Sequence, residues 1–160
     1  MTINSRFCQT ISLTELSVKN NQLTSLPDNI GLLSSLEYLS VDKNRITHLP
    51  ESFDLLISLK ELHVSHNLLP HLIESIGLRA SLTTLDVSHN VLIQLPNSIA
   101  WLVSLVHLNI SCNQLVIFPK SICCLNLNEL HIYNIPITSN EMACNETKVM
   151  IGNSARTVYI

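Results

Sequence analysis

The chain has 160 residues, of which 46% are hydrophobic and 13% are charged, and its net charge is −3. Its nine Lys and Arg residues are scattered and do not form the basic groove that would neutralise nucleic-acid phosphates. No apolar run reaches the roughly 18 residues of a membrane-spanning helix, and residues 1–6 lack a signal-peptide core. We therefore expect no nucleic-acid partner and no membrane span.

One phrase recurs five times with a fixed period of 23 residues. It reads Leu-x-x-Leu-x-Leu/Val/Ile-x-x-Asn-x-Leu/Ile and opens at Leu13, Leu36, Leu59, Leu82 and Leu105. A unit this short cannot bury an apolar face by itself, so each unit has to pack on the next. The repeat therefore predicts a solenoid.

The first part of each repeat has the pattern of a strand. Leu16-x-Val18 and its equivalents alternate apolar and polar residues, which is typical of a strand with one buried face. We expect these strands to form a parallel sheet on the concave side of a curved array. Their buried residues form columns that repeat every 23 positions.

An asparagine follows each of these five strands. The column consists of Asn21, Asn44, Asn67, Asn90 and Asn113. A buried turn needs a side chain that both donates and accepts hydrogen bonds, because an unpaired buried polar group costs about 1–3 kcal/mol. We therefore interpret this column as structural.

The second half of the repeat reads Leu-Pro-x-x-Ile/Phe-x-x-Leu. Its proline fixes φ and opens an extended or single-turn segment. These prolines are Pro27, Pro50, Pro96 and Pro119. Because this half is bulkier than a strand, we expect irregular, 3-10 or short helical segments on the convex side. The fold class is then an α/β solenoid.

The two ends depart from the repeat. Residues 1–12 read as the latter half of a repeat or a cap, 13–137 as five regular repeats and one degenerate repeat, and 138–160 as a tail or cap. Ile135 stands where the next asparagine would be. The tail's Thr157–Ile160 has strong strand propensity, so we expect it to add to a sheet edge in the same or a second molecule. Bare edges also predict a homo-oligomer formed through the ends or the tail.

The repeat carries a family resemblance. A 23-residue consensus with Leu-Pro-x-x-Ile-x-x-Leu resembles the leucine-rich repeats of the Ras-group type, as seen in adenylate cyclase and Ras-binding scaffold proteins, over roughly residues 13–137. The resemblance implies a protein-interaction module, with a small GTPase or a phosphatase signalling component as the kind of partner. It says little about the individual partner, because the consensus consists of core positions.

The outward-facing strand positions are the candidate binding surface. The most varied chemistry lies in its middle, at Tyr38, Asp42, His63, His66, Asp86, His89 and His107. Zinc ligands form a tight, oriented set with supporting partners, whereas ligands on one gently curved sheet diverge. A thiol nucleophile at Cys112 would need an orienting group and an oxyanion site that an open sheet lacks. We therefore expect no metal, no cofactor and no catalytic residue.

A second candidate surface lies on the convex side. One position is apolar in successive repeats and immediately precedes a buried column, so it should be partly exposed. This convex apolar stripe consists of Leu32, Leu55, Leu78 and Trp101. Arg79 interrupts the buried column, and we expect Leu78 to turn inward there so that Arg79 reaches water.

The resulting functional hypothesis is a non-catalytic scaffold or interaction module in intracellular signalling, binding its partner on the concave face. Five cysteines without paired cap clusters favour free thiols and a cytoplasmic location. One alternative is a self-assembling structural repeat protein driven by incomplete caps and the tail. Another is an extracellular or surface adhesion protein, which would show disulfides or glycans at Asn109 or Asn145.

Overall fold

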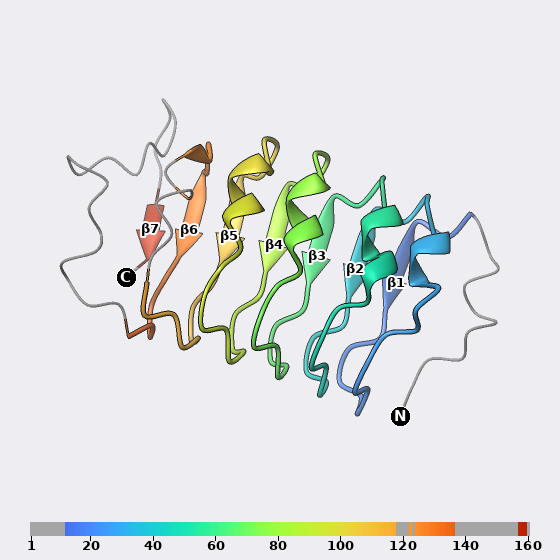
Figure 1. The fold of residues 1–160 in the computed structure, drawn as a ribbon, viewed down its shortest axis with the longest axis horizontal. Helices are drawn as coiled ribbons and strands as arrows, with labels where there is room; N and C mark the ends of the chain where they lie inside the picture. The colour runs from blue at the N-terminus through green and yellow to red at the C-terminus, as the bar shows by residue number, and fades with distance from the viewer. Residues whose placement is uncertain (1–11, 118–121, 123, 137–156, 160) are drawn as a thin grey trace.

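The computed structural model describes residues 12–117, 122, 124–136 and 157–159. Seven parallel strands form one sheet in which the spatial order follows the chain order (Figure 1). The strands are β1 (Glu15–Ser17), β2 (Tyr38–Ser40), β3 (Glu61–His63), β4 (Thr84–Asp86), β5 (His107–Asn109), β6 (Glu129–His131) and β7 (Thr157–Tyr159). Each of β1 to β5 pairs with its counterpart in the next repeat, so the predicted repeat and its strand are confirmed.

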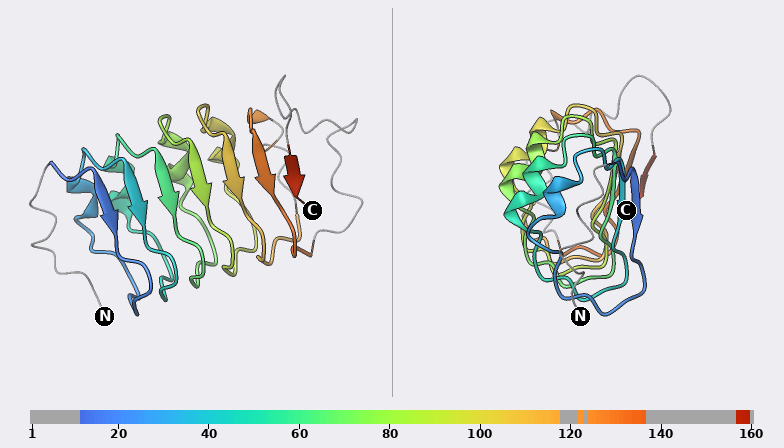
Figure 2. Two further views of the ribbon diagram at one scale, coloured as in Figure 1. Left: turned by 180° about the vertical axis from the view of Figure 1, so that it is seen from behind. Right: turned by 90° about the vertical axis from the view of Figure 1, so that its right-hand side faces the viewer.

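The opposite side of the coil consists of short 3-10 segments (Figure 2). They are η2 (Ile30–Leu32), η3 (Glu51–Leu55), η4 (Glu74–Leu78) and η5 (Asn97–Trp101). Pro50 and Pro96 precede η3 and η5 with extended backbone, at φ −70° and −65°. Ile73 takes the same conformation before η4, at φ −66°, so the turn forms without proline. The predicted 3-10 segments of the convex side are confirmed.

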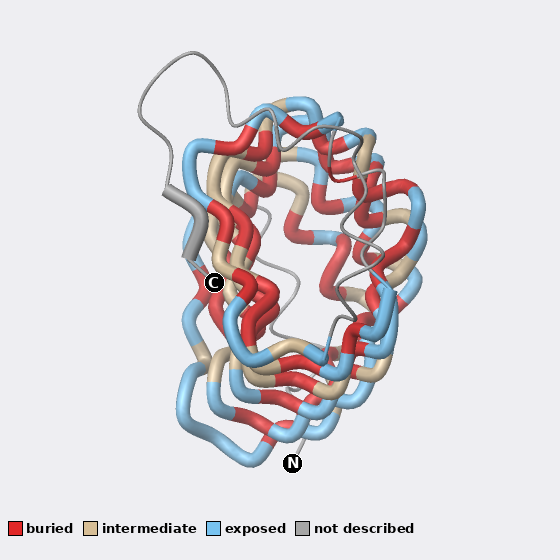
Figure 3. The backbone as a smooth tube through the Cα atoms, turned by 90° about the vertical axis from the view of Figure 1, so that its left-hand side faces the viewer, coloured by how far each residue is buried: buried red, intermediate tan, exposed pale blue. Residues whose placement is uncertain are grey.

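The core is a set of leucine layers enclosed between the strands and the η segments. Around each turn of the coil in Figure 3, buried stretches alternate with intermediate and exposed ones. Leu39 and Leu62 are fully buried under the sheet, and Ile30, Phe53 and Ile76 are fully buried under the η segments. Each layer packs mainly on its neighbours, as expected for a solenoid.

The asparagine column joins adjacent repeats. The side-chain amide of Asn67 donates to the carbonyl oxygens of Val64 (3.1 Å) and Ser65 (3.1 Å) in its own repeat and of Val41 (3.0 Å) in the preceding one. Its Oδ1 accepts from the backbone N–H of Ile46 at 2.8 Å, also in the preceding repeat. Four bonds per asparagine satisfy backbone groups that water does not reach. The same pattern recurs at Asn44, Asn90 and Asn113.

Asn21 differs from the other asparagines, and its assignment to a buried column is wrong. Its side chain is exposed, and within the described ranges it donates to Val18 O (3.1 Å) and Lys19 O (3.0 Å), both in its own turn. The described residues before β1 contain no asparagine turn for it to bond.

Two glycines permit close packing of the η segments. A Cβ atom at Gly31 would collide with the carbonyl oxygen of Ser52, and one at Gly77 with the carbonyl oxygen of Ser98. The Ser98 hydroxyl also donates to the carbonyl oxygen of Glu74 at 2.6 Å. Gly31 therefore lets η2 approach η3, and Gly77 lets η4 approach η5.

The expected exchange between Leu78 and Arg79 is wrong. Leu78 is 57% exposed and Arg79 only 6%. The η4 turn keeps the geometry of the other turns, so the aliphatic stem of Arg79 fills the core position that leucine fills elsewhere. Burial lowers the pKa of the guanidinium, and attraction to Asp54 opposes that shift. The Nε and Nη1 atoms of Arg79 are buried and have no hydrogen-bond partner within the described ranges.

The tail supplies the last strand of the sheet. β7 pairs with β6 in parallel, with Val158 beside Leu130. The expectation that this segment adds to a sheet edge is confirmed, and the edge belongs to the same molecule. β7 thus covers backbone groups that β6 would otherwise expose. The proposed boundaries at 12/13 and 137/138 stay predictions, because 1–11, 137–156 and 160 lie outside the described residues.

Replacing a ladder asparagine should cost far more stability than replacing the first one. We expect Asn67→Ala and Asn90→Ala each to lower the free energy of unfolding by at least about 2 kcal/mol, because each leaves several buried backbone groups unpaired. Asn21→Ala is the matched control and should cost under about 1 kcal/mol. Urea unfolding measures all three, and equal losses would contradict the ladder interpretation.

Removing β7 should expose the β6 edge. We expect a chain ending at residue 156 to aggregate at concentrations where the full chain stays in solution, because unpaired strand edges recruit other strands. Light scattering measures this. A chain with Gly-Ser residues in place of 157–160 controls for length, and equal solubility of all three would show that β7 does not protect the edge.

Candidate functional site

The concave face, defined here as the outward surface of β1 to β6, carries two columns of side chains in strict register. The first runs through Glu15, Tyr38, Glu61, Thr84, His107 and Glu129, and the second through Ser17, Ser40, His63, Asp86, Asn109 and His131. Since neighbouring parallel strands lie about 4.8 Å apart, side chains in one column can contact each other across repeats.

A polar network surrounds Asp42 just past the end of β2. Its Oδ1 accepts from the backbone N–H (2.8 Å) and the hydroxyl (3.0 Å) of Ser65. Its Oδ2 accepts from the hydroxyl of Ser40 at 2.8 Å and lies 3.4 Å from Lys19 Nζ. Asp42 therefore joins three repeats, and most of its capacity to accept hydrogen bonds is already used within the protein.

Aromatic groups extend this network across the first three strands. Lys19 Nζ lies 5.9 Å from the centre of the Tyr38 ring, and that ring lies 5.3 Å from the His63 ring. The interaction with the Tyr38 side chain is the largest cause that raises the pKa of Lys19, and attraction to Asp42 adds to it. His63 also lies 3.4 Å from Glu61, measured from Nε2 to Oε2.

Towards the C-terminal strands the concave face is hollowed. A depression of about 160 Å³ is lined by polar side chains of β3 to β6, among them His63, Asp86, His107, Glu129 and His131. Glu129 Oε2 lies 3.4 Å from His107 Nδ1 and 3.7 Å from His131 Nε2. Alternating imidazoles and carboxylates give this depression both donors and acceptors for a polar ligand.

His66 and His89 stack where their strands end. Their ring centres lie 4.0 Å apart with an interplanar angle of 9°, which confirms that they are neighbours. Both have left-handed backbone, at φ 52° and 51°. The equivalent positions in other repeats share this conformation, and they are Asn20, Lys43, Cys112 and Asn134.

The pKa of His66 is lowered, first by burial and then by His89 and Lys43. Attraction to Asp86 and Asp42 opposes this shift. The stacked pair thus adds a pH-sensitive group at the edge of the concave face.

The structure brings together most of the candidate residues. Tyr38 contacts His63, and His66 contacts His89. Asp86 and His107 line the depression with His63. Asp42 instead accepts a hydrogen bond from the backbone N–H of Ser65 and so links the turns of two repeats.

Sequence reasoning left Glu129, His131 and Lys19 out of the candidate set. Glu129 and His131 line the depression together with His63 and Asp86. The last repeat is one residue shorter than the others, so these two positions follow from aligning its leucines, Leu127 and Leu130, and not from the 23-residue period.

The described residues contain no group of three or more His, Cys, Asp or Glu side chains arranged to hold a metal ion. Cys112 and Cys124 are free thiols. Asn109 lies in β5, and its Oδ1 accepts from the Ser111 N–H at 3.2 Å. Within the described ranges no helix has both the length and the hydropathy needed to cross a bilayer.

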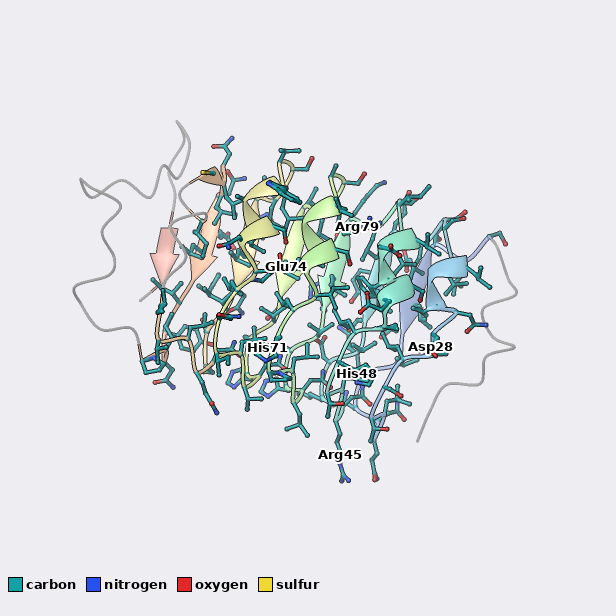
Figure 4. The ribbon with its side chains drawn as sticks, viewed as in Figure 1. Asp28, Arg45, His48, His71, Glu74 and Arg79 are labelled. Carbon is teal, nitrogen blue, oxygen red and sulfur yellow. The ribbon has the colours of Figure 1, made fainter. Side chains whose placement is uncertain are left out.

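A larger groove of about 430 Å³ lies away from the concave face, near Pro50 and Pro70. Its polar lining includes Asp28, His48, Glu51 and His71. Figure 4 shows His48, His71 and Asp28 below the η segments, whereas Glu74 and Arg79 lie beside η4. The groove is separate from the candidate surface.

Comparison with known proteins gives two family matches along the chain. A model described as "Leucine rich repeat" matches residues 11–69, and one described as "Leucine Rich Repeat" matches 81–102 and 104–125. No curated protein matches the sequence.

Several solved structures share the fold. A leucine-rich repeat protein of Leptospira interrogans superposes with a TM-score of 0.84 at 36% identity, over 88% of this chain and 36% of that one. The octameric complex of Latrophilin 3, Unc5D and the leucine-rich repeats of FLRT2 gives 0.69 at 32%, over 79% and 41%. The ectodomain of the Arabidopsis thaliana receptor kinase GASSHO1/SCHENGEN3, in complex with Casparian strip integrity factor 2, gives 0.78 at 27%, over 84% and 17%. The chain thus spans less than half of each relative.

The stacked histidines should make stability depend on pH. Because the folded state lowers the pKa of His66, the unfolded chain binds its proton more tightly, so stability should fall as the pH drops through the ordinary value of 6.5. We expect His66→Asn, which tolerates left-handed backbone, to reduce the fall in melting temperature between about pH 7.5 and 5.5. His71→Asn is the matched control. If both variants kept the wild-type pH profile, the stacked pair would not be its source.

Proposed function

Because the chain belongs to the leucine-rich repeat proteins, we propose that it is a non-catalytic interaction module that binds a partner protein on its concave face. The leucine-rich repeat fold is generally a protein-interaction module. Its backbone and leucines are committed to the ladder and the core, so recognition falls to side chains that vary between repeats.

The observation that carries this proposal is the depression between β3 and β6. Its histidines and carboxylates project from β3 to β6, and the asparagine ladder fixes the register of β3, β4 and β5. Tyr38 and His63 form an aromatic contact on the strands before it. Rigidly held aromatic and imidazole groups lose little conformational entropy on binding, which suits a protein interface.

Two relatives support a protein partner. The repeats of FLRT2 occur in an octameric complex with Latrophilin 3 and Unc5D, and the plant receptor ectodomain is in complex with Casparian strip integrity factor 2. This chain covers only 41% and 17% of those chains, so their partners are not transferred to it. The proposal is supported because, in both of these structures, leucine-rich repeats form part of a complex with other proteins.

For the setting, we propose cytoplasmic signalling with a small GTPase or phosphatase component as partner, and oligomerisation through the ends. The Ras-group resemblance and the free thiols of Cys112 and Cys124 support this choice. The relatives that are receptor components favour the extracellular alternative instead. Mass spectrometry of the native protein separates the two, because glycans at Asn109 or Asn145, or disulfides, would support only the extracellular setting.

Partner recognition should fail when the concave face is altered. We expect Tyr38→Ala combined with His107→Ala to abolish recovery of at least one of the proteins that the wild-type chain retains after crosslinking and affinity purification. Both side chains point outward and their contacts are surface contacts, so the melting temperature should stay close to wild type. Asp42 and Asp86 are unsuitable probes, because they accept hydrogen bonds from the backbone N–H groups of Ser65 and Ser88.

Leu68→Ser combined with Ile93→Ser is the matched control, because these two exposed apolar residues lie outside β1 to β6 and outside the convex apolar stripe. It should retain the same partners. If the concave double variant kept every wild-type partner, the concave proposal would be overturned.

A further inference from the structure

The convex apolar stripe is exposed along the whole array. Leu32, Leu55, Leu78 and Trp101 are 53%, 51%, 57% and 61% exposed, and each ends an η segment. Two residues further along, Ile57 and Val103 are 67% and 75% exposed and widen the stripe in two of the four repeats, whereas Ser34 and Ala80 hold the equivalent positions in the others. Contiguous exposed apolar surface of this kind marks an interaction site more often than scattered single residues do.

A row of acidic side chains accompanies the stripe. The charged residues within η2 to η5 are Glu51, Asp54 and Glu74, all acidic and all exposed. Asp28, also exposed, precedes η2. Arg79, which follows η4, is buried. The described surface of the η segments therefore combines an apolar band with negative charge only.

The apolar band and the negative charge together restrict which kinds of molecule could bind to this surface. A second copy of the same surface would bring only further acidic groups from its η segments, and an anionic membrane surface would repel them. A basic amphipathic helix satisfies both features, with one apolar face and flanking Lys or Arg. Charge complementarity thus favours a helical protein partner.

The spacing also suits a helix. Successive turns of an α-helix are about 5.4 Å apart, and repeats stack at about 4.8 Å in the sheet and somewhat wider on the convex side. A helix lying across the η segments would therefore place about one apolar side chain per turn against each repeat. Four repeats correspond to about three turns, or roughly 11 residues.

We propose that the convex face docks a basic amphipathic helix of a partner protein, with its apolar side chains on Leu32, Leu55, Leu78 and Trp101 and its basic side chains near Glu51, Asp54 and Glu74. This second surface is independent of the concave face. A protein could therefore occupy each face at the same time.

Trp101 provides the test, because it is the only tryptophan in the chain. The probe is a synthetic peptide of Leu and Lys at helical spacing, about 15 residues long and free of aromatic residues. We expect saturable blue-shifted emission from Trp101 and induced helix in the peptide. Leu55→Ser with Leu78→Ser should weaken binding about tenfold, because two half-buried leucine contacts are lost. Glu51→Gln with Glu74→Gln should weaken it and reduce its salt dependence.

The matched control is Leu68→Ser with Ile93→Ser, which changes two exposed apolar residues outside the stripe. It should bind like wild type. Equal binding by both serine pairs, equal binding of a Leu and Glu peptide, or no blue shift would overturn the proposal. A blue shift with anionic phospholipid vesicles but not with the peptide would also overturn it. The same holds for a blue shift that appears when the protein concentration is raised without any peptide. The concave Tyr38→Ala and His107→Ala variant should bind the peptide normally, which keeps this test separate from that of the concave face.

Discussion

The asparagine ladder is the constraint on which the rest of the structure depends. Each ladder asparagine bonds its own turn and the preceding repeat, so neighbouring repeats can pair only in one register. Fixed register aligns the leucine layers, and it also aligns the outward columns of the strands and the ends of the η segments. Both candidate surfaces therefore follow from a set of hydrogen bonds that neither surface contains.

The fold was predictable because the period fixes it. Repeated leucines specify the strands, and repeated Asn and Pro specify the turns, including those of Asn44 to Asn113. The prediction failed where a single residue departs from its column. Arg79 counts as polar in any pattern, yet its aliphatic stem packs like a leucine. Asn21 matches the motif, yet its side chain is exposed and its described bonds stay within its own turn.

The candidate site was less predictable than the fold. The repeat shows which side chains point outward, and hence that His63 and His107 share a face. It does not show which of them are already engaged within the protein. Asp42 bonds Ser65 of the next repeat, whereas Asp86, which lies two positions earlier in its repeat, bonds Ser88 of its own. Such differences depend on side-chain geometry across two repeats, which one sequence pattern does not encode.

The left-handed residues after the strands have a consequence for the rim of the concave face. Glycine adopts this conformation at no steric cost, whereas other side chains lose about 1 kcal/mol each. None of the six described positions is glycine, and Lys43, His66, His89 and Cys112 are not even asparagine. These four positions are thus less stable than glycine would make them, and they give the rim three kinds of side chain, Lys, His and Cys. Glycine substitutions at these positions should make the array more stable. They would also remove the side chains by which the rim differs from one repeat to the next.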